Sequence, residues 1–172
     1  MDLINLLKER YSVRQYEKKA VPDELITEIL EAGRVAPTAA NRQPFKIIVV
    51  RSEDGIRKLS RGAQTHGAQT AFIICGDTET VWVREYDNYK TTDVDCSIVT
   101  DHMMLEAVSL GLGTLWMTWF NPESIRREFD IPERYVPINI LLVGYAAGKG
   151  ASPDRHSKMR RPLNDFIVNE TF

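Results

Sequence analysis

Two groups of basic residues, one near each end of the chain, have the side-chain types and the spacing of an anion-binding site. Arg10, Ser12 and Arg14 alternate, so in an extended segment two guanidinium groups and a hydroxyl lie on one side. The second group contains four basic residues within seven positions: Arg155, Lys158, Arg160 and Arg161. Arginine binds phosphate through paired hydrogen bonds, and lysine binds it as a point charge. The two groups would form a phosphate site if they meet, whereas each one alone is more often a solvated surface.

The segment over residues 36–44, APTAANRQP, is a further candidate binding element. Its two prolines and its lack of periodicity predict a loop, which leads directly into a predicted strand. Residues 38–40 are small and let a flat ligand approach the backbone, and the side-chain amides of Asn41 and Gln43 both donate and accept hydrogen bonds. The loop is therefore a candidate ligand-binding segment, with an ordinary connection as the alternative.

Two glycine-rich segments do not match the nucleotide-binding motifs. The segment over residues 111–113, Gly-Leu-Gly, lacks a third glycine and precedes a predicted strand, so it is interpreted as the stop of a helix. The segment over residues 144–150 has the wrong spacing and no Ser or Thr after Lys149. The three histidines have no Cys or carboxylate at ligand spacing, so the sequence predicts neither a metal site nor a nucleophile triad.

Composition narrows the class of protein. The chain has 172 residues, 43% hydrophobic and 27% charged, which predicts one globular domain over residues 1–172. With 22 basic and 24 acidic residues the net charge is −2, which gives no field to attract nucleic acid or an anionic membrane. No signal peptide or membrane span is recognisable, and Cys75 and Cys96, without a CxxC partner, are expected to be reduced and buried. We expect a cytoplasmic protein that binds neither nucleic acid nor membrane.

The elements that position these residues follow no regular alternation of strands and helices. Strands are predicted over residues 45–50, 70–75 and 136–145, and a strand or extended segment is predicted over residues 114–120. Helices are predicted after Asp2, after Pro22, after Ser52, over residues 91–112, after Asn121 and after Pro162, and residues 148–161 are expected to be a basic loop. This order indicates the α+β class and argues against a doubly wound sheet.

The predicted helix over residues 91–112 is apolar on two opposite sides. At about 100° per residue, one side carries Val94, Ile98, Leu105, Val108 and Leu112, and the other carries Cys96, Val99, Met103, Ala107 and Leu110. A helix of this kind must be buried on both sides. Because a chain of this size rarely encloses such a long helix, we expect a partner subunit to cover one side.

Five motifs in this order resemble the FMN-dependent nitroreductase family. They are RYSVRQY at 10–16, APTAANRQPF at 36–45, DHMMLEA with GLGTLWM within 101–117, GY at 144–145 and KMRRPL at 158–163. The resemblance spans nearly the whole chain. It implies an α+β fold in which helices flank a mixed, mainly antiparallel sheet, and an intertwined homodimer with one FMN per subunit at the interface.

The resemblance also assigns roles to the basic residues. Arg10 and Ser12, with Tyr11 between them, match the family's motif that holds the phosphate and the ribityl chain. Lys158 and Arg160 match the C-terminal pair that contacts the phosphate. Arg14 matches a basic residue near the pyrimidine edge of the flavin, where a positive charge would favour reduced FMN.

Further flavin contacts are implied in the loop and beyond the predicted strand. In the family the loop comes from the other subunit, and it corresponds here to Pro37, Thr38, Ala39, Asn41 and Gln43. Many members carry a Gly-containing segment whose backbone amide faces flavin N5, where this chain has Met117, Thr118 and Trp119. We expect the backbone of Thr118 to keep that contact and Trp119 to make the pocket narrower and aromatic. Gln64 is the nearest candidate for the polar residue at the pyrimidine.

The implied activity is hydride transfer from NAD(P)H to FMN, followed by two-electron reduction of a nitroaromatic or quinone-type acceptor at the same place. The cofactor carries the redox chemistry, so no side chain is expected to act as a nucleophile and no metal is expected. Two alternatives stay open: a flavoenzyme that acts on another metabolite as a dehydrogenase or with oxygen, and a non-catalytic flavin carrier or sensor.

Overall fold

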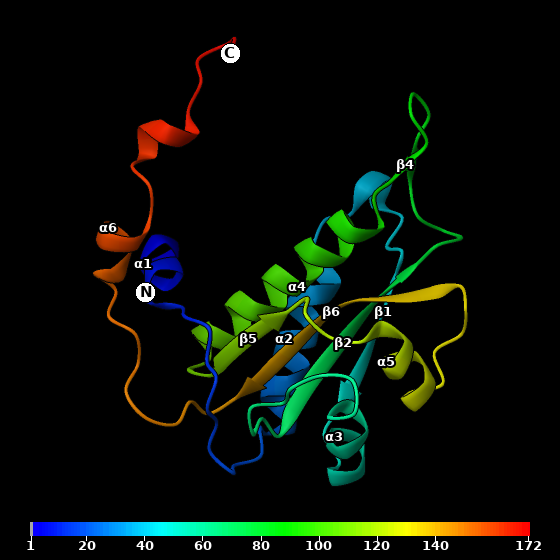
Figure 1. Cartoon of the computed structure of the whole chain (residues 1–172), viewed down its shortest axis with the longest axis vertical. Coiled ribbons are helices and arrows are strands. Elements are labelled where there is room, and N and C mark those ends of the chain that lie inside the picture. The colour runs from blue at the N-terminus through cyan, green and yellow to red at the C-terminus, as the bar shows by residue number, and fades with distance from the viewer. Residues whose placement is uncertain (1) are drawn as a thin grey trace.

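Four strands form one antiparallel sheet in the order β1-β2-β6-β5 (Figure 1). They are β1 (Phe45–Val50), β2 (Thr70–Asp77), β5 (Gly113–Met117) and β6 (Tyr135–Gly144). The computed structural model describes residues 2–172, and within them every residue of β2 is buried. The α+β class and the antiparallel sheet flanked by helices are confirmed. A sheet with some parallel pairing was expected, but all the strand pairs of this sheet are antiparallel. Parallel pairing occurs in the described residues as an isolated bridge between Ser12 and Thr114.

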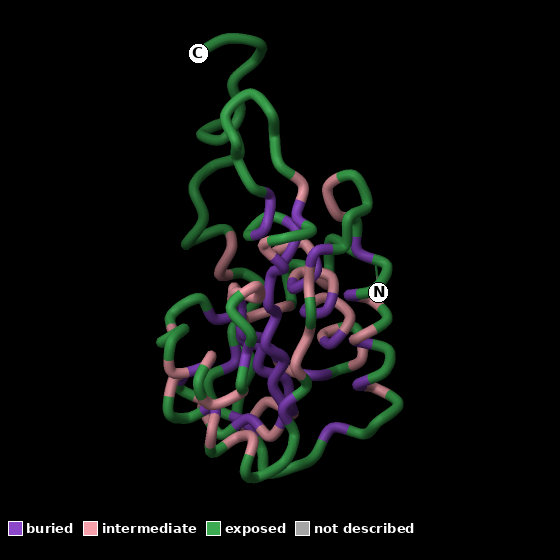
Figure 2. The backbone as a smooth tube through the Cα atoms, turned by 90° about the vertical axis from the view of Figure 1, so that its right-hand side faces the viewer, coloured by how far each residue is buried: buried purple, intermediate pink, exposed green. Residues whose placement is uncertain are grey.

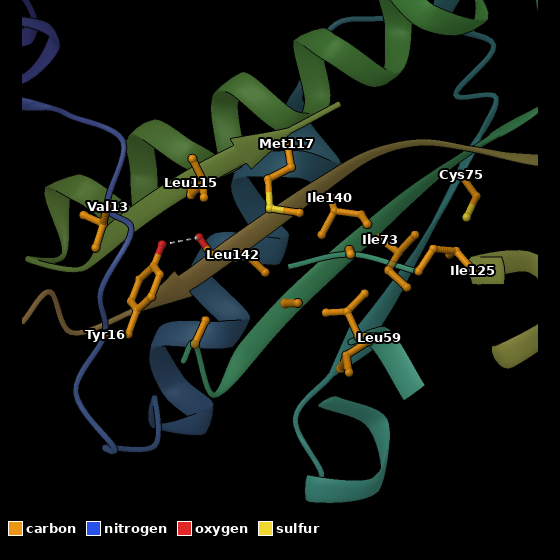
Figure 3. Packing of buried hydrophobic residues seen from close by; sticks show 14 of the residues in the cluster. Val13, Tyr16, Leu59, Ile73, Cys75, Leu115, Met117, Ile125, Ile140 and Leu142 are labelled. Carbon is orange, nitrogen blue, oxygen red and sulfur yellow. Dashed lines mark hydrogen bonds between the residues drawn. The ribbon is translucent and has the colours of Figure 1, made fainter. Parts of the chain in front are cut away.

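Helices cover both faces of this sheet. On one face lie α2 (Asp23–Val35) and α4 (Thr92–Ser109), whose side chains pack against those of β2 and β6. On the other face lie α3 (Glu53–Leu59), α5 (Pro122–Glu128) and the extended segment over residues 11–16 (Figure 3). Tyr16 closes this second layer by donating a hydrogen bond from its hydroxyl to the Leu142 carbonyl, at 3.4 Å. Two apolar layers therefore hold the sheet rigid.

Local sequence signals explain the ends of several helices. The side chains of Asp2, Ser52 and Asn121 cap α1 (Leu3–Glu9), α3 and α5 as predicted, each accepting a hydrogen bond from a backbone amide three residues on. At the end of α4, Gly111 has a φ of 80°, and the amides of Gly111 and Leu112 donate to the carbonyls of Val108 and Ala107. This arrangement confirms Gly111 as the stop of a helix.

Several elements differ from the sequence prediction. The predicted helix over 91–112 ends at Ser109, and the predicted strand over 70–75 continues to Asp77. The predicted strand over 114–120 ends at Met117, and the helix after Pro162 is a short 3-10 turn, η2 (Leu163–Phe166). The predicted basic loop contains α6 (Arg155–Met159). A small hairpin, β3 (Val83–Arg84) with β4 (Tyr89–Lys90), was not predicted because two-residue strands have no detectable period.

Only one side of α4 is covered within the chain. Cys96, Val99, Met103 and Ala107 are buried, whereas Val94 is 44% exposed. Ile98, Leu105 and Val108 are half-buried on that open side. Two apolar sides are therefore present over α4, and the side with Val94 lacks a full layer of protein over it. Leu112, predicted on that side, lies beyond the end of the helix and is buried.

Both cysteines lie in the interior as expected. Cys75 and Cys96 are buried and form no disulfide, and burial raises the pKa of each thiol to about 12, so both stay protonated at neutral pH. In residues 2–172 no helix combines the length and the apolar character needed to cross a lipid bilayer.

The contact between β2 and the start of α4 leaves no room for a side chain at Gly76. A Cβ there would lie 2.1 Å from Cγ2 of Thr92 and 3.3 Å from the sulfur of Cys96. We expect Gly76→Ala to lower the free energy of unfolding by roughly 1–3 kcal/mol, because α4 must shift off the sheet. Thr92→Ser removes the obstructing methyl group, so the double variant should regain most of the loss in urea unfolding. A single variant as stable as the unmodified protein would contradict this packing.

Candidate functional site: a basic cluster where the two chain ends meet

The two basic groups predicted from the sequence meet in the structure. Nη2 of Arg155, at the start of α6, donates a hydrogen bond to the backbone carbonyl of Arg10, at the end of α1. Nε2 of His156 lies 3.0 Å from the carbonyl oxygen of Lys8, which can only accept. These contacts hold α6 beside α1, orange beside blue in Figure 1. The two ends of the sequence therefore form one surface.

Arg10 is the centre of this cluster. Its side chain is half-buried, and its pKa is lowered, first by burial and then by the nearby charge of Arg155. Asp101 acts in the opposite direction, and Arg160 lowers the pKa further. Lys158 and Arg160 are exposed and follow Arg155 along and just after α6. The cluster thus carries an excess of positive charge in a place where water screens it incompletely, which favours an anion.

The segment after Arg10 is extended, as its alternating pattern predicts. Val13 is buried and donates from its backbone amide to the carbonyl of Thr114 at 2.8 Å. Ser12 and Arg14 are exposed, and Nη1 of Arg14 donates to the carbonyl of Ser12 at 3.3 Å. Tyr11 is half-buried. Because the buried Val13 holds this segment along the edge strand β5, the hydroxyl and the guanidinium both face solvent.

The loop over residues 37–43 is shaped by its own hydrogen bonds. Ala39 donates from its amide to Oδ1 of Asp95 at 2.8 Å, and Gln43 donates from its amide to Oγ1 of Thr38 at 3.0 Å. The side-chain amide of Gln43 donates to the carbonyl of Asn41 at 3.0 Å. The loop includes the 3-10 turn η1 (Ala39–Asn41), and positive φ angles occur at Ala40, Asn41 and Gln43. Pro37, Asn41 and Gln43 are exposed.

The loop and the basic cluster do not come together within one chain. Asp95 anchors the loop at the first turn of α4. In contrast, Leu3 and Leu6 of α1 share a groove with Leu105, in the second half of that helix. The helix therefore separates the two groups of predicted site residues, as Figure 1 shows.

A third group of predicted residues lines an open hollow of about 600 Å³ between the ends of α3 and β5. Gln64 and Trp119 lie on its wall with the half-buried Phe120. Trp119 is 87% exposed. The amide of Asn121 donates to the carbonyl of Gly62 at 2.8 Å, which ties the two sides of the hollow together. The hollow thus presents one large free aromatic ring beside one free amide.

The strand that leads to this hollow ends earlier than predicted. Met117, the last residue of β5, is buried and pairs with Ile140 of β6. Thr118 and Trp119 lie beyond the pairing and are exposed. The chain leaves the sheet here because the next residues are drawn toward Gly62 and the start of α5. The part of the predicted strand or extended segment that pairs in the sheet is therefore limited to β5, and Thr118 and Trp119 lie on the surface.

Two residues that make contacts at these sites, Arg155 and Asp95, carry no distinguishing signal in the sequence. Arg155 was visible as part of the C-terminal run of basic residues, but nothing distinguished it from Arg161. Asp95, which holds the loop, was visible only as an acid in the first turn of a helix, where carboxylates are common for a different reason. Both residues act through contacts between distant parts of the chain, which spacing along a sequence does not reveal.

The fold and the basic cluster together describe one class of protein. This is an α+β protein in which basic residues from both ends of the chain meet around Arg10.

Comparisons with known proteins agree on one family. The family model described as "Nitroreductase family" matches residues 7–65 and 57–145. The crystal structure of a nitroreductase family protein from Clostridium difficile 630 superimposes with a TM-score of 0.98 at 46% identity, over 100% of both chains. An FMN-dependent nitroreductase from Clostridium difficile R20291 superimposes with a TM-score of 0.80 at 25% identity, over 99% of this chain and 100% of the other.

A relative from Methanothermobacter thermautotrophicus, provisionally named NADH dehydrogenase/NAD(P)H nitroreductase, is 34% identical over an alignment of 167 positions that covers 90% of this chain and 82% of that protein. The chain belongs to the nitroreductase family, a family of oxidoreductases. The resemblance seen in the five motifs is thereby confirmed.

We expect inorganic phosphate to stabilise the flavin-free protein more than chloride does at equal ionic strength. At a phosphate concentration ten times its Kd, binding adds about 1.4 kcal/mol, or roughly 3–6 °C in Tm. Arg10→Gln should abolish the shift, whereas Lys46→Gln, which removes an exposed charge on β1, should keep it. Thermal unfolding at matched ionic strength measures this, and equal shifts in both salts would contradict an anion site.

Proposed function

We propose that this protein is an FMN-dependent NAD(P)H oxidoreductase that reduces nitroaromatic or quinone-type acceptors by two electrons. The observation that supports the proposal is the contact between α1 and α6, which brings Arg155 to the carbonyl of Arg10 and Arg160 close enough to lower the pKa of Arg10. Family membership and the names of relatives, which include FMN and NAD(P)H, support the same function.

The side chains around Arg10 suit the phosphate of FMN. Guanidinium groups bind phosphate through two parallel hydrogen bonds, and an ammonium group adds a compact charge. The lowered pKa of Arg10 reflects burial and repulsion that a dianion would offset. We therefore assign the phosphate to Arg10, Lys158 and Arg160, and the ribityl chain to the segment with Tyr11 and Ser12.

We assign the remaining flavin contacts to exposed residues between the basic cluster and the hollow. Arg14 would lie near the pyrimidine edge, with Gln64 as a second polar contact. Met117 ends the strand on which the ring would rest, and the backbone amide of Thr118 would face N5. Trp119, whose indole is free in this chain, would stand beside the place where an acceptor stacks.

A homodimer completes this proposal. Large apolar side chains are exposed on α1, on the open side of α4 and in the segment over residues 148–172, which we name the C-terminal arm and which projects from the sheet (Figure 2). They include Leu3, Ile4, Val94, Met159, Leu163, Phe166 and Ile167. Burying such surface favours association of two copies. In an intertwined dimer the loop over 37–43 of one subunit would reach the basic cluster of the other, from which it is separated within a single chain.

Bound FMN would supply the redox step, taking a hydride from NAD(P)H and passing two electrons to the acceptor. The chain's own residues bind and orient. Arg14 would stabilise negative charge at the pyrimidine edge by a preorganised interaction. The hollow beside Trp119 admits a flat ring, so the donor and the acceptor would occupy one place in turn, which is a ping-pong order. No side chain needs to form a covalent bond with either substrate.

The decisive experiment is anaerobic reduction of the purified protein. We expect flavin absorbance that bleaches on addition of NADH or NADPH and returns on addition of a quinone or a nitroaromatic compound. Persistent colour with both donors would favour a flavin carrier or an enzyme with a different electron donor. A colourless protein that cannot be reconstituted with FMN would refute every flavin-based function.

Arg14 and the C-terminal pair should affect different steps. We expect Arg14→Ala to retain some FMN and to slow its reduction by NAD(P)H about tenfold, because one charge-assisted interaction with the ring is lost. The double variant Lys158→Ala with Arg160→Ala should mainly empty the site, with a Kd for FMN on the order of 100-fold higher. Stopped-flow reduction and flavin titration measure the two effects. An Arg14→Ala variant with the unmodified reduction rate and flavin potential would refute its electrostatic role.

Trp119 should act mainly on the acceptor. Loss of aromatic stacking costs about 0.5–1.5 kcal/mol, so Trp119→Ala should raise KM for a nitroaromatic acceptor roughly three- to tenfold. The Kd for FMN should change less, and Trp119→Phe should restore most of the KM. Steady-state kinetics with one nitroaromatic and one quinone give the comparison. An unchanged KM in the alanine variant would show that the exposed indole does not contact the acceptor.

A further inference from the structure

The C-terminal arm has its half-buried contact with its own subunit at the start of α6, while Gly150 lies beside the ring of Tyr11. Almost all of its residues are exposed, and Figure 2 shows it as a green tube that projects from the buried sheet. Arg155 and His156 are its two half-buried residues. The attachment of the arm to this subunit therefore depends on the first turn of α6.

Both half-buried side chains bind the carbonyl end of α1. Arg155 divides its guanidinium between two backbone oxygens, with Nη2 donating to Arg10 and Nη1 donating to Ser152 at 2.9 Å. His156 contacts the carbonyl of Lys8 at 3.0 Å. The last carbonyls of a helix have no partner within the helix and carry the negative end of its dipole, so cationic or N–H donors stabilise them. The contact is thus a built helix cap supplied from the opposite end of the sequence.

This cap places positive charges close together, and a bound anion would offset the repulsion between them. Arg155 lies close enough to Arg10 to lower its pKa, and Arg160 adds to the repulsion, against the single opposing charge of Asp101. Two N–H groups of Arg155 donate to backbone carbonyls, so these hydrogen bonds hold the arm in place. The residues that follow it, Lys158 and Arg160, are exposed and free to turn to a ligand.

We propose that Arg155 and His156 are positioning residues: they pin the C-terminal arm to α1 and thereby bring Lys158 and Arg160 to the phosphate site at Arg10. The inference rests on the proposed FMN function for the identity of the anion. Attachment of the arm to α1 and binding of the phosphate stabilise each other, because both require α6 to lie beside α1. The affinity for a flavin without a phosphate, such as riboflavin, does not depend on Arg155 and His156.

The test compares the affinities of the apoprotein for FMN and for riboflavin across matched variants. Arg155→Ala should weaken FMN about tenfold and leave riboflavin within twofold, since one charged hydrogen-bonding pair holds the arm. Arg155→Lys keeps the charge but cannot bridge both carbonyls, so it should also lose most of the preference for FMN. His156→Gln, which keeps a donor, should behave as the unmodified protein, whereas His156→Ala should not. Arg161→Ala is the control, because it also removes one positive charge from the arm. The guanidinium carbon of Arg161 lies 4.5 Å from the centroid of the Phe166 ring, within the arm itself.

Hydrogen exchange provides a readout that does not depend on flavin. In the flavin-free protein, the amides over residues 155–160 should exchange several-fold faster in Arg155→Ala than in Arg161→Ala. Equal exchange in the two variants, an Arg155→Lys variant with full FMN preference, or an equal loss in Arg161→Ala would overturn the proposal. If the unmodified protein binds neither flavin, the proposed function fails, and the exchange comparison still decides whether Arg155 pins the arm.

Discussion

The site depends on the repulsion between cations that are held together around a half-buried arginine. Arg10, Arg155 and Arg160 gather where solvent screens their charges only in part, and Asp101 offsets a fraction of the cost. The backbone carbonyls at the end of α1 accept some of the guanidinium hydrogen bonds. A cluster in this condition gains most from a multiply charged anion, and it needs no glycine-rich loop because side chains replace backbone amides as donors.

The helix α4 imposes the second constraint. Its buried side joins it to the sheet through Val99 and Met103, and its open side leaves Val94 and Ile98 against solvent. The same helix separates the loop anchored at Asp95 from the basic cluster. This helix therefore leaves an apolar surface partly uncovered and keeps two groups of predicted site residues apart, and in the proposed dimer a second copy of the chain would cover the surface and bring the two groups together. This links the proposed dimer to the proposed chemistry.

Local signals predicted much of the fold, and contacts between distant segments explain where they failed. Asp2, Ser52, Asn121 and Gly111 act within one turn of a helix, so their types and positions were sufficient. The point where β5 ends could not be predicted because Thr118 and Trp119 continue a strand-like pattern, while the hydrogen bond from Asn121 to Gly62 draws the chain away from the sheet. The helix α6 was missed because it has no apolar period and forms where Arg155 and His156 meet α1.

The sequence by itself determined the family, the α+β class, most helix and strand positions and the kinds of side chain available for binding an anion. These properties follow from residue type and from spacing over a few positions. Only the tertiary structure decided which basic residues meet, that Arg155 rather than Arg161 contacts α1, that Asp95 holds the loop and that Trp119 stands free in a hollow. The physical reason is that electrostatic and hydrogen-bond energies depend on distance and burial, which arise only when segments that are distant in the sequence are packed together.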